Sequence, residues 1–354
     1  MDIKEKPPLV IGHSVPPEFF ARYHTQKKRT YYTKHRLVTF CCAILTLLLF
    51  WAVLSRAQTD SEQNSRLERL ARQFDYFRYF FRSRPAADRD LEWIEERRLP
   101  GAIIIGARKA GTRALLEFLK LHPAVRTARY EVHYFNNNET YEKGLDWYLG
   151  RMPSSRPDQI TVEKTPGYFT SEYVPERVRR MNASIKLILI VREPVTRAIS
   201  DYTQVHYTKL SKNKTHQPFS ELVFAEDGGL NRNYKPIRNS LYAEHYRNWL
   251  RHFSHENIAI VDGEALTRQP MPQLRKLERY LGLPTRIREE SLYFNETKGF
   301  YCFRYRSGQE PRCLGDSKGR PHVTVDENTI RKLKELFRPH NEEFYSLSGV
   351  KFDW

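Results

Sequence analysis

The residues best suited to chemistry lie in the segment Gly106-Ala-Arg-Lys109-Ala110-Gly111-Thr112-Arg113, which joins a β-branched run to a helical pattern. Two glycines allow a tight backbone turn, and the helix that follows directs free N–H groups and its positive dipole end toward the loop. The Gly-x4-Gly spacing is that of a nucleotide-binding P-loop, so the segment predicts a cradle for phosphate or an isostere of phosphate. The alternative is an ordinary turn between a strand and a helix that carries solvated cations.

The same segment departs from the P-loop of kinases and ATPases. Thr112 follows Gly111 where those proteins have Lys, and Lys109 lies inside the loop instead. Enzymes that use Mg²⁺ also need an acidic residue after a second strand, whereas the run 185–191 ends in Arg192. Lys109, Arg113 and Arg192 can neutralise phosphates directly, which predicts a site that needs no metal.

A second group of residues provides acid–base chemistry. Strand-like alternation in Tyr130-Glu131-Val132-His133 places Glu131 and His133 on one face, and a carboxylate among cations can act as a general base. Lys164 follows the strand-like run 159–163, at the edge where open α/β sheets bind ligands. Either cluster alone would also fit an ordinary surface.

Alternating strand and helix patterns must position these residues. We expect strands at 102–105, 159–163, 185–191 and 258–261, and helices at 112–121 and 194–207. Strands separated by helices predict an α/β fold with a parallel sheet covered on both faces. Pro194 is a typical helix start, and Gly282 after the run 274–281 is a typical helix stop. One domain of about 255 residues fits this pattern better than two.

The N-terminal part predicts a membrane anchor. Residues 37–54 are 18 uncharged residues, and at about 1.5 Å per residue they span roughly 27 Å, close to the hydrocarbon thickness of a membrane. Five Lys or Arg lie at 27–36, while only Arg56 follows closely, which predicts a cytosolic N-terminus. A cleaved signal peptide is the alternative, but a 36-residue basic lead without a small-x-small site before Ser55 is not typical of one.

This topology predicts which cysteines can pair. Cys41 and Cys42 lie in the span, so Cys302 and Cys313 are the only lumenal pair and should form a disulfide. Sequons at Asn138, Asn182, Asn213 and Asn295 give weak support for the same compartment.

The lumenal part is strongly basic. Eight Lys or Arg and three Asp or Glu precede the uncharged span, so +12 of the net charge of +17 belongs to residues 55–354. The compartment excludes nucleic acid, which leaves a sulfated or carboxylated glycan as the expected partner. An excess of cations that serves only solubility is the alternative.

Taken together, these residues resemble the heparan sulfate 3-O-sulfotransferases of the Golgi, from about Pro100 to Trp354. The specific pieces are, in order, residues 106–113, Glu131-Val-His133, Glu163-Lys-Thr-Pro166, Arg192-Glu-Pro194, Ser200-Asp-Tyr-Thr-Gln204, Lys298-Gly-Phe-Tyr-Cys302, Cys313, Ser317-Lys-Gly-Arg320 and Phe352-Asp-Trp354. Segments 181–187 and 196–204 are most similar to the type 5 members.

The resemblance implies a complete organisation for the chain. A cytosolic tail (1–36), a transmembrane signal anchor (37–54) and a lumenal stem (55–96) would precede a single sulfotransferase domain (97–354). That domain would have the sulfotransferase fold, a P-loop-like central parallel sheet flanked by helices. It would transfer a sulfuryl group from 3′-phosphoadenosine 5′-phosphosulfate (PAPS) to the 3-hydroxyl of a glucosamine in heparan sulfate, without a metal.

Roles for individual residues follow from the same resemblance. Glu131 would be the general base, with His133 as its helper, and Lys109 and Lys164 would stabilise the transferring group. At the phosphosulfate, the remaining donor residues would be Ala110, Gly111, Thr112 and Arg113, and at the 3′-phosphate they would be Arg192 and Ser200. The Cys302–Cys313 bridge would position a further group that closes over the donor, which is Tyr301, Lys318, Gly319 and Arg320. The remaining acceptor residues would be Asn136, Thr165, Pro166, Gln204 and Trp249.

Two positions depart from the family pattern. Asn136 stands where the family has Asp, which leaves fine substrate choice open, and Ala110 replaces a glycine of the loop. Two other functions remain as alternatives: a sulfotransferase that acts at another glycan position, and a membrane-anchored heparan-binding protein without catalysis. The Glu131-Val-His133 and Glu163–Pro166 pieces argue against the first, and the intact Glu131 and Lys109 against the second.

Overall fold

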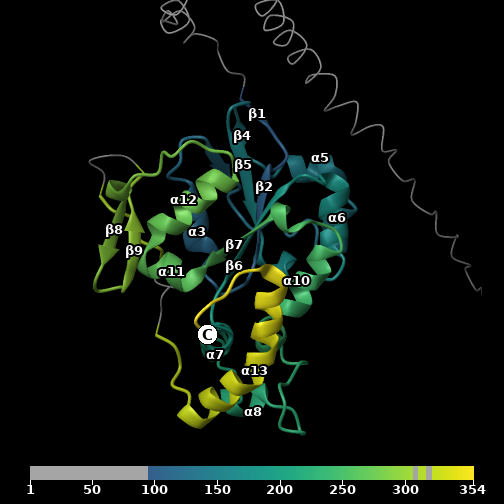
Figure 1. The fold of residues 1–354 in the computed structure, drawn as a ribbon, viewed down its shortest axis with the longest axis vertical. Helices are drawn as coiled ribbons and strands as arrows, with labels where there is room; N and C mark the ends of the chain where they lie inside the picture. Colours follow the sequence, from purple (N-terminus) through teal and green to yellow (C-terminus); the bar gives the residue numbers. More distant parts are fainter. Residues whose placement is uncertain (1–94, 306–309, 316–320) are drawn as a thin grey trace, which may run out of the picture. The chain divides into compact units, whose positions relative to one another are not determined.

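A five-stranded parallel sheet forms the centre of the fold, with the strand order β3-β5-β2-β6-β7 (Figure 1). Its strands are β2 (Ala102–Gly106), β3 (Val125–Thr127), β5 (Ile160–Lys164), β6 (Lys186–Val191) and β7 (Ile258–Asp262). The four strands expected from the sequence are present, with bounds that differ by one residue at most. The three-residue β3 was not expected, because so short a strand shows no alternation that a sequence pattern can reveal.

The computed structural model describes residues 95–305, 310–315 and 321–354. The expected tail, membrane anchor and most of the stem lie outside these residues, as do Lys318, Gly319 and Arg320. Within them, no helix is both long enough and apolar enough to cross a membrane.

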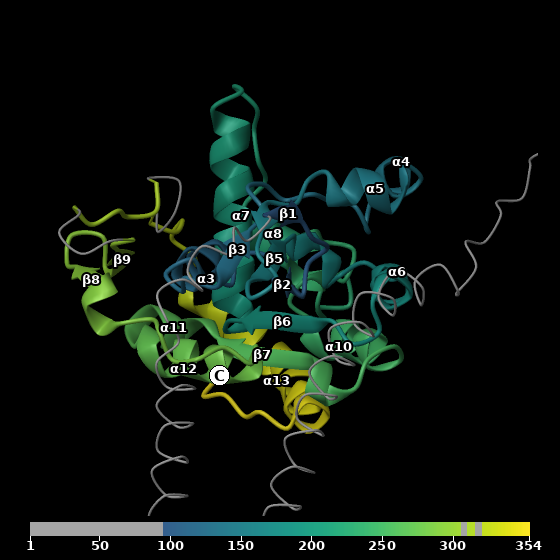
Figure 2. The same ribbon diagram turned by 90° about the horizontal axis from the view of Figure 1, so that it is seen from above.

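The core strands are apolar because both faces of the sheet are covered. All five residues of β2 and the last five of β6 are buried. Continuous β-branched runs are typical of parallel strands that helices cover on both sides. In both views α3 (Thr112–Leu119), α11 (Gly263–Arg268) and α12 (Pro270–Tyr280) lie on one side of the sheet, and α6 (Val174–Met181) and α10 (Tyr242–Leu250) lie on the other (Figures 1 and 2). The α/β prediction is therefore confirmed.

The two helices expected at 112–121 and 194–207 begin at the residues that the sequence indicated. Helix α3 starts at Thr112, and α7 (Pro194–Leu210) starts at Pro194. The Glu193 carboxylate caps α7 by accepting the backbone N–H groups of Val195 and Thr196, at 3.0 and 2.7 Å. Gly282 stops α12 with a φ of +71°. Local start and stop signals thus set these bounds.

The longest helix among the described residues was not expected from the sequence. Helix α13 (Glu327–Ser348) is capped by Asp326, whose side chain accepts from the Thr329 N–H at 2.8 Å. It buries Leu333 and Phe337 among residues of α7, and Phe344 in the main core. Only three of its 22 residues are buried apolar side chains, so the helical periodicity of apolar residues is weak in this segment.

Short elements complete the domain. They are β1 (Glu96–Arg97) paired antiparallel with β4 (Ser154–Ser155), the hairpin of β8 (Leu292–Asn295) and β9 (Phe300–Phe303), the helices α4 (Asn138–Tyr141), α5 (Gly144–Leu149), α8 (Phe219–Val223) and α9 (Lys235–Arg238), and the 3-10 turns η2 (Pro166–Tyr168), η3 (His255–Asn257) and η4 (Glu289–Ser291).

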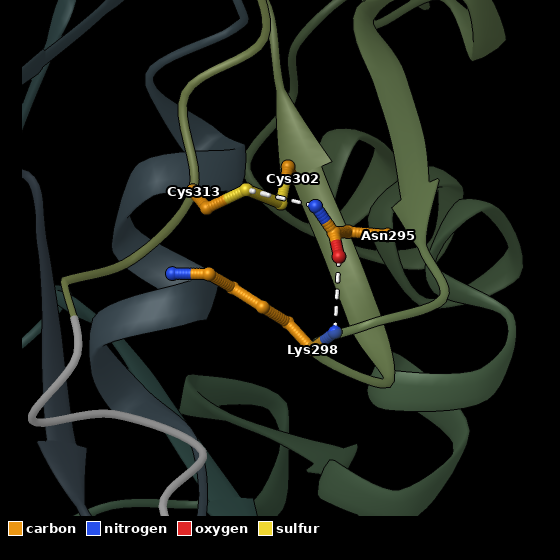
Figure 3. The surroundings of a disulfide bond; sticks show 4 residues. All are labelled: Asn295, Lys298, Cys302 and Cys313. Carbon is orange, nitrogen blue, oxygen red and sulfur yellow. Dashed lines mark hydrogen bonds between the residues drawn. A yellow bond between two sulfur atoms is a disulfide. The ribbon is translucent and has the colours of Figure 1, made fainter.

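A disulfide joins Cys302 on β9 to Cys313, which confirms the predicted pair (Figure 3). Beside it, the Asn295 side-chain oxygen accepts from the Lys298 N–H at 2.9 Å, which closes the turn between β8 and β9. The bridge therefore ties the segment after β9 to the hairpin that also carries Tyr301.

Candidate active site

A cavity of about 950 Å³ lies at the carboxyl edge of the sheet and brings most of the predicted site residues together. Its lining follows the ends of β2, β5, β6 and β7, where ligands bind in open α/β sheets. The predicted residues that line it are Lys109, Ala110, Gly111, Thr112, Arg113, Glu131, His133, Asn136, Pro166, Arg192, Ser200, Gln204 and Tyr301.

The loop after β2 is shaped to receive an anion. A side chain at Gly106 would place its Cβ 2.5 Å from the Cβ of Phe169, so the loop can pass this point only with a glycine. Lys109 and Gly111 have φ values of +70° and +108°, which turn the loop into the start of α3. No side chain in the described part of the chain caps α3, so its first N–H groups are available to a ligand.

A buried ion pair holds this loop against α7. Arg197 is fully buried, donates to the Arg108 carbonyl at 3.1 Å and pairs with Asp201 at 2.9 Å. Asp201 also accepts from Arg108 Nε at 2.8 Å, and its pKa is lowered because the two guanidiniums outweigh the cost of its burial. The loop conformation is therefore fixed from the neighbouring helix.

Lys109 connects the loop to the same helix. Its Nζ donates to Gln204 Oε1 at 3.1 Å, and Gln204 lies one turn after Asp201 on α7. This contact places a predicted donor residue directly beside a predicted acceptor residue. The two halves of the expected site thus meet at α7.

Glu131 lines the cavity and lies between Lys164 and His133. It accepts from Lys164 Nζ, and its other oxygen is 3.5 Å from His133 Nε2. The hydrogen bond from His133, followed by Lys164, lowers the pKa of Glu131 to about 2, although burial opposes the shift. The hydrogen bond to Glu131 raises the pKa of His133, whose Nδ1 lies 3.2 Å from Asn136 Oδ1. Glu131 is therefore ionised in any neutral solution.

The carboxylate of Glu163 lies beneath this pair and does not reach the cavity. It is fully buried, accepts from Thr165 Oγ1, and accepts from Tyr148 OH at 3.4 Å. Burial raises its pKa to about 7. Thr165 in turn accepts from the Val132 N–H at 3.1 Å, so this cluster holds the backbone between Glu131 and His133.

The chain is similar in sequence to known sulfotransferases. Residues 99–346 match the model of the sulfotransferase domain family. Heparan sulfate glucosamine 3-O-sulfotransferase 5 from Mus musculus and from Homo sapiens are each 51% identical to the chain over 257 residues, which are 72% of this chain and 74% of each relative. The Mus musculus heparan sulfate glucosamine 3-O-sulfotransferase 6 is 44% identical over 73% of this chain and 74% of that relative.

The chain belongs to the heparan sulfate glucosamine 3-O-sulfotransferase family. A crystal structure of a sulfotransferase from Alicyclobacillus acidocaldarius shares the fold of this sulfotransferase, with a TM-score of 0.53 and 18% identity over 72% of this chain and 98% of that one.

Two residues expected to contact the glycan instead lie inside this sulfotransferase. Trp249 is fully buried, and its Nε1 donates to the Phe169 carbonyl at 3.1 Å. Thr165 is also fully buried between Glu163 and Val132. The expectation that they touch the acceptor is wrong, because neither side chain reaches the surface. Trp249 supports Phe169, the residue against which Gly106 packs.

Other residues of the sulfotransferase site were missed from the sequence. Arg197 and Asp201 share one face of α7 with Ser200 and Gln204, and that spacing is a signal that could have revealed them. Further lining residues are Arg108, Lys235, Arg238, Lys298 and His322. The pKa of His322 is lowered by burial and by the nearby cations Arg192 and Lys109. Arg108 and Lys298 lie in the segments 106–113 and 298–302 that the sequence singled out, whereas no local pattern distinguishes Lys235, Arg238 and His322 from ordinary surface residues.

Proposed function

We propose that this protein transfers a sulfuryl group from PAPS to the 3-hydroxyl of a glucosamine residue in heparan sulfate. The observation that carries the proposal is the position of Glu131, an ionised carboxylate that lines the same cavity as the cationic loop of Lys109 and Arg113. Relatives that are 44 to 51% identical carry the name of this activity.

The cavity has the charge that a sulfated nucleotide requires. Lys109, Arg113 and Arg192 line it together with the uncapped N-terminus of α3. We assign the loop 109–113 to the phosphosulfate, and Arg192 with Ser200 to the 3′-phosphate. Such a set of cations and N–H groups can bind several phosphate oxygens at once. Tyr301 and the segment 318–320 are proposed to cover the donor.

The acceptor chemistry is proposed to run through Glu131. The glucosamine 3-hydroxyl gives its proton to Glu131, its oxygen bonds to sulfur, and the bond from sulfur to the nucleotide oxygen breaks with its electron pair on the nucleotide. Because Lys164 and His133 hold the pKa of Glu131 at about 2, Glu131 becomes a better base when Lys164 turns from it toward the negative oxygens of the transferring group. Lys109 stabilises the same oxygens from the other side, and we expect no metal in this step.

The test is product analysis with the purified protein, labelled PAPS and heparan sulfate. Disaccharide analysis should locate the label at the glucosamine 3-hydroxyl, and activity should survive EDTA. A general base contributes about 10²–10⁴-fold, so Glu131→Gln should lower kcat by that factor and leave the Kd for PAPS nearly unchanged. Glu139→Gln, an exposed carboxylate on α4 outside the cavity, is the matched control.

Other outcomes would point to other functions. Label at the N-position or the 6-hydroxyl would make the protein a sulfotransferase of different regiochemistry. Heparan sulfate binding without any affinity for PAPS would indicate a glycan-binding protein without catalysis. Near-normal turnover by Glu131→Gln, or loss of activity on chelation with rescue by Mg²⁺, would contradict the mechanism.

We also propose that the protein is a single-pass type II protein of the Golgi membrane, with its catalytic domain in the lumen. The uncharged segment 37–54 and the basic flank before it support this topology. In sealed microsomes, protease should remove residues 1–36 and leave the domain intact. Digestion of the domain without detergent would exclude the topology.

A further inference from the structure

Glu264 lies at a point where three backbone segments of the site meet. It occupies the first turn of α11, directly after β7 and Gly263. A Cβ at residue 263 would lie 2.6 Å from the carbonyl oxygen of Ala110 and 2.8 Å from that of Val191. Only a glycine lets this turn approach both the donor loop and the end of β6, and that approach brings Glu264 next to Arg192.

The contacts of Glu264 are directed at Arg192 and its neighbour. One carboxylate oxygen accepts from Arg192 Nε at 3.2 Å and from the Glu193 N–H at 3.2 Å. The other oxygen is buried and has no hydrogen-bond partner among the residues that the structure describes. A buried carboxylate oxygen without a hydrogen bond is costly for the fold, so its presence calls for a role outside packing.

Arg192 is held at two points and keeps its terminal nitrogens available. Its carbonyl accepts from Tyr242 OH at 2.8 Å, which fixes the backbone, and Glu264 fixes the side chain through Nε. In the described part of the chain, Nη1 and Nη2 make no hydrogen bond. A guanidinium binds a phosphate best with two parallel N–H groups, and the Nε contact leaves both terminal groups for that purpose.

We propose that Glu264 is a positioning residue for the 3′-phosphate of the donor: it holds Arg192 by Nε, so that the terminal nitrogens of the guanidinium face the cavity. The inference rests on the proposed function, because it requires a nucleotide with a 3′-phosphate. A carboxylate that competed with the phosphate would take Nη1 or Nη2, whereas Glu264 contacts neither.

The test compares two nucleotides that differ only in this phosphate. Titration calorimetry on the full chain in detergent would measure the Kd values for adenosine 3′,5′-bisphosphate and adenosine 5′-monophosphate. A hydrogen bond to a charged group is worth about 10-fold or more in affinity, so Glu264→Ala should weaken binding of the bisphosphate by that factor. Binding of the monophosphate should stay the same, because the 5′-phosphate contacts the loop.

Two further variants separate contact from charge. Glu264→Asp keeps the charge but is too short to reach Nε of Arg192, so, like Glu264→Ala, it should lose the preference for the bisphosphate over the monophosphate. Glu264→Gln keeps an oxygen that can accept both N–H groups, so it should retain most of this preference.

If Glu264 acts through Arg192, Glu264→Ala should have no further effect on nucleotide binding in an Arg192→Ala background. Glu256→Ala, an exposed carboxylate on η3, is the control.

The outcomes also distinguish the two proposals. A wild-type protein that binds the bisphosphate no better than the monophosphate would overturn the proposed function, and the role of Glu264 with it. A wild-type preference that Glu264→Ala and Glu264→Asp both retain would overturn only the role of Glu264. An equal loss of affinity for both nucleotides in Glu264→Ala, or tighter binding of the bisphosphate by that variant, would also overturn the role of Glu264.

Discussion

Glu131 and Glu163 are close in the structure, yet their environments shift their pKa values in opposite directions. His133 and Lys164 beside Glu131 lower its pKa to about 2, whereas burial raises the pKa of Glu163 to about 7. The first carboxylate faces the cavity and is ready to meet a substrate. The second only orients Thr165, which holds the backbone beside Glu131. At the scale of single residues, burial and partners separate the chemical role from the supporting one.

The raised pKa of Glu163 predicts a measurable pH dependence of stability. The folded state keeps a proton that the unfolded chain releases between pH 4.5 and about 7, so this residue costs stability as the pH rises through that window. Glu163→Gln removes this cost. Urea unfolding at about pH 5 and about pH 7.5 should show the variant gaining stability relative to wild type at the higher pH.

Glu131 does not complicate this measurement. Its lowered pKa gives stability that is present above pH 4.5 and lost only as the pH falls toward 2. Glu139→Gln should follow the wild-type profile at both pH values. If the stability difference between wild type and Glu163→Gln were the same at both, Glu163 would be ionised throughout and our assignment of its environment would be incorrect.

At the scale of elements, α7 connects the parts of the site. One face of it carries Arg197, Ser200, Asp201 and Gln204, which contact the donor loop or line the cavity. The helix is therefore both a core element and the support of the loop. The pair of Arg197 and Asp201 is buried, while the equally spaced pair of Glu176 and Arg180 on α6 is exposed.

This contrast between two i,i+4 pairs predicts very different costs of substitution. Arg197→Met leaves Asp201 buried with Arg108 as its one remaining partner among the residues that the structure describes, and breaking a buried pair costs about 3–5 kcal/mol. Arg180→Met removes a solvated pair and should cost about 0.5 kcal/mol or less. Urea unfolding would measure the free energy of unfolding of both variants relative to wild type. Similar losses in the two variants would mean that the buried pair adds no more stability than the exposed pair.

The disulfide hairpin is the second element that bears on the donor. Cys302 follows Tyr301, and both Tyr301 and Lys298 line the cavity. Cys313→Ser should therefore raise the KM for PAPS more than the KM for glycan, and lower stability by about 2–3 kcal/mol. The double variant at Cys302 and Cys313 should behave like the single one. Thiol labelling of both cysteines in unreduced, folded protein, located by mass spectrometry, would show that no bridge forms.

At the scale of the whole molecule, net charge governs the approach of the substrate. Residues 55–354 carry +12 of the net charge of +17, and Lys235, Arg238 and Lys298 add cations to the rim of the site beyond the donor loop. A polyanionic chain is attracted to such a surface before any specific contact forms.

Affinity for the glycan should therefore fall steeply with salt. The screening length is about 8 Å at physiological ionic strength and shorter above it, so exposed charge contacts weaken together. Titration of a heparan sulfate oligosaccharide at increasing NaCl should give a steep loss of affinity. An unsulfated oligosaccharide of equal length should show a shallower loss. An affinity that hardly changed with salt would show that charge is not what recruits the glycan.

Much of this protein could be predicted from its sequence, because local signals set local structure. The β-branched runs specified four of the five strands of the central sheet. Gly111 directly precedes α3, and Pro194 is the first residue of α7. The glycine-containing turn after β2 and the position of Arg192 after β6 could be predicted for the same reason. Each depends on residue types within a few positions of one another.

The tertiary structure alone decided which side chains meet and which are enclosed. Lys164 pairs with Glu131 across 33 positions, and Glu264 reaches Arg192 across 72. Trp249 was expected to contact the acceptor but lies in the core, and Arg197, which no sequence pattern singled out, is fully buried. The sequence could not determine these outcomes, because burial and pairing depend on the order and spacing of strands that are distant in the chain. Charge and hydrophobicity fix what a residue can do, and only the assembled fold fixes whether it meets a ligand or supports the residue that does.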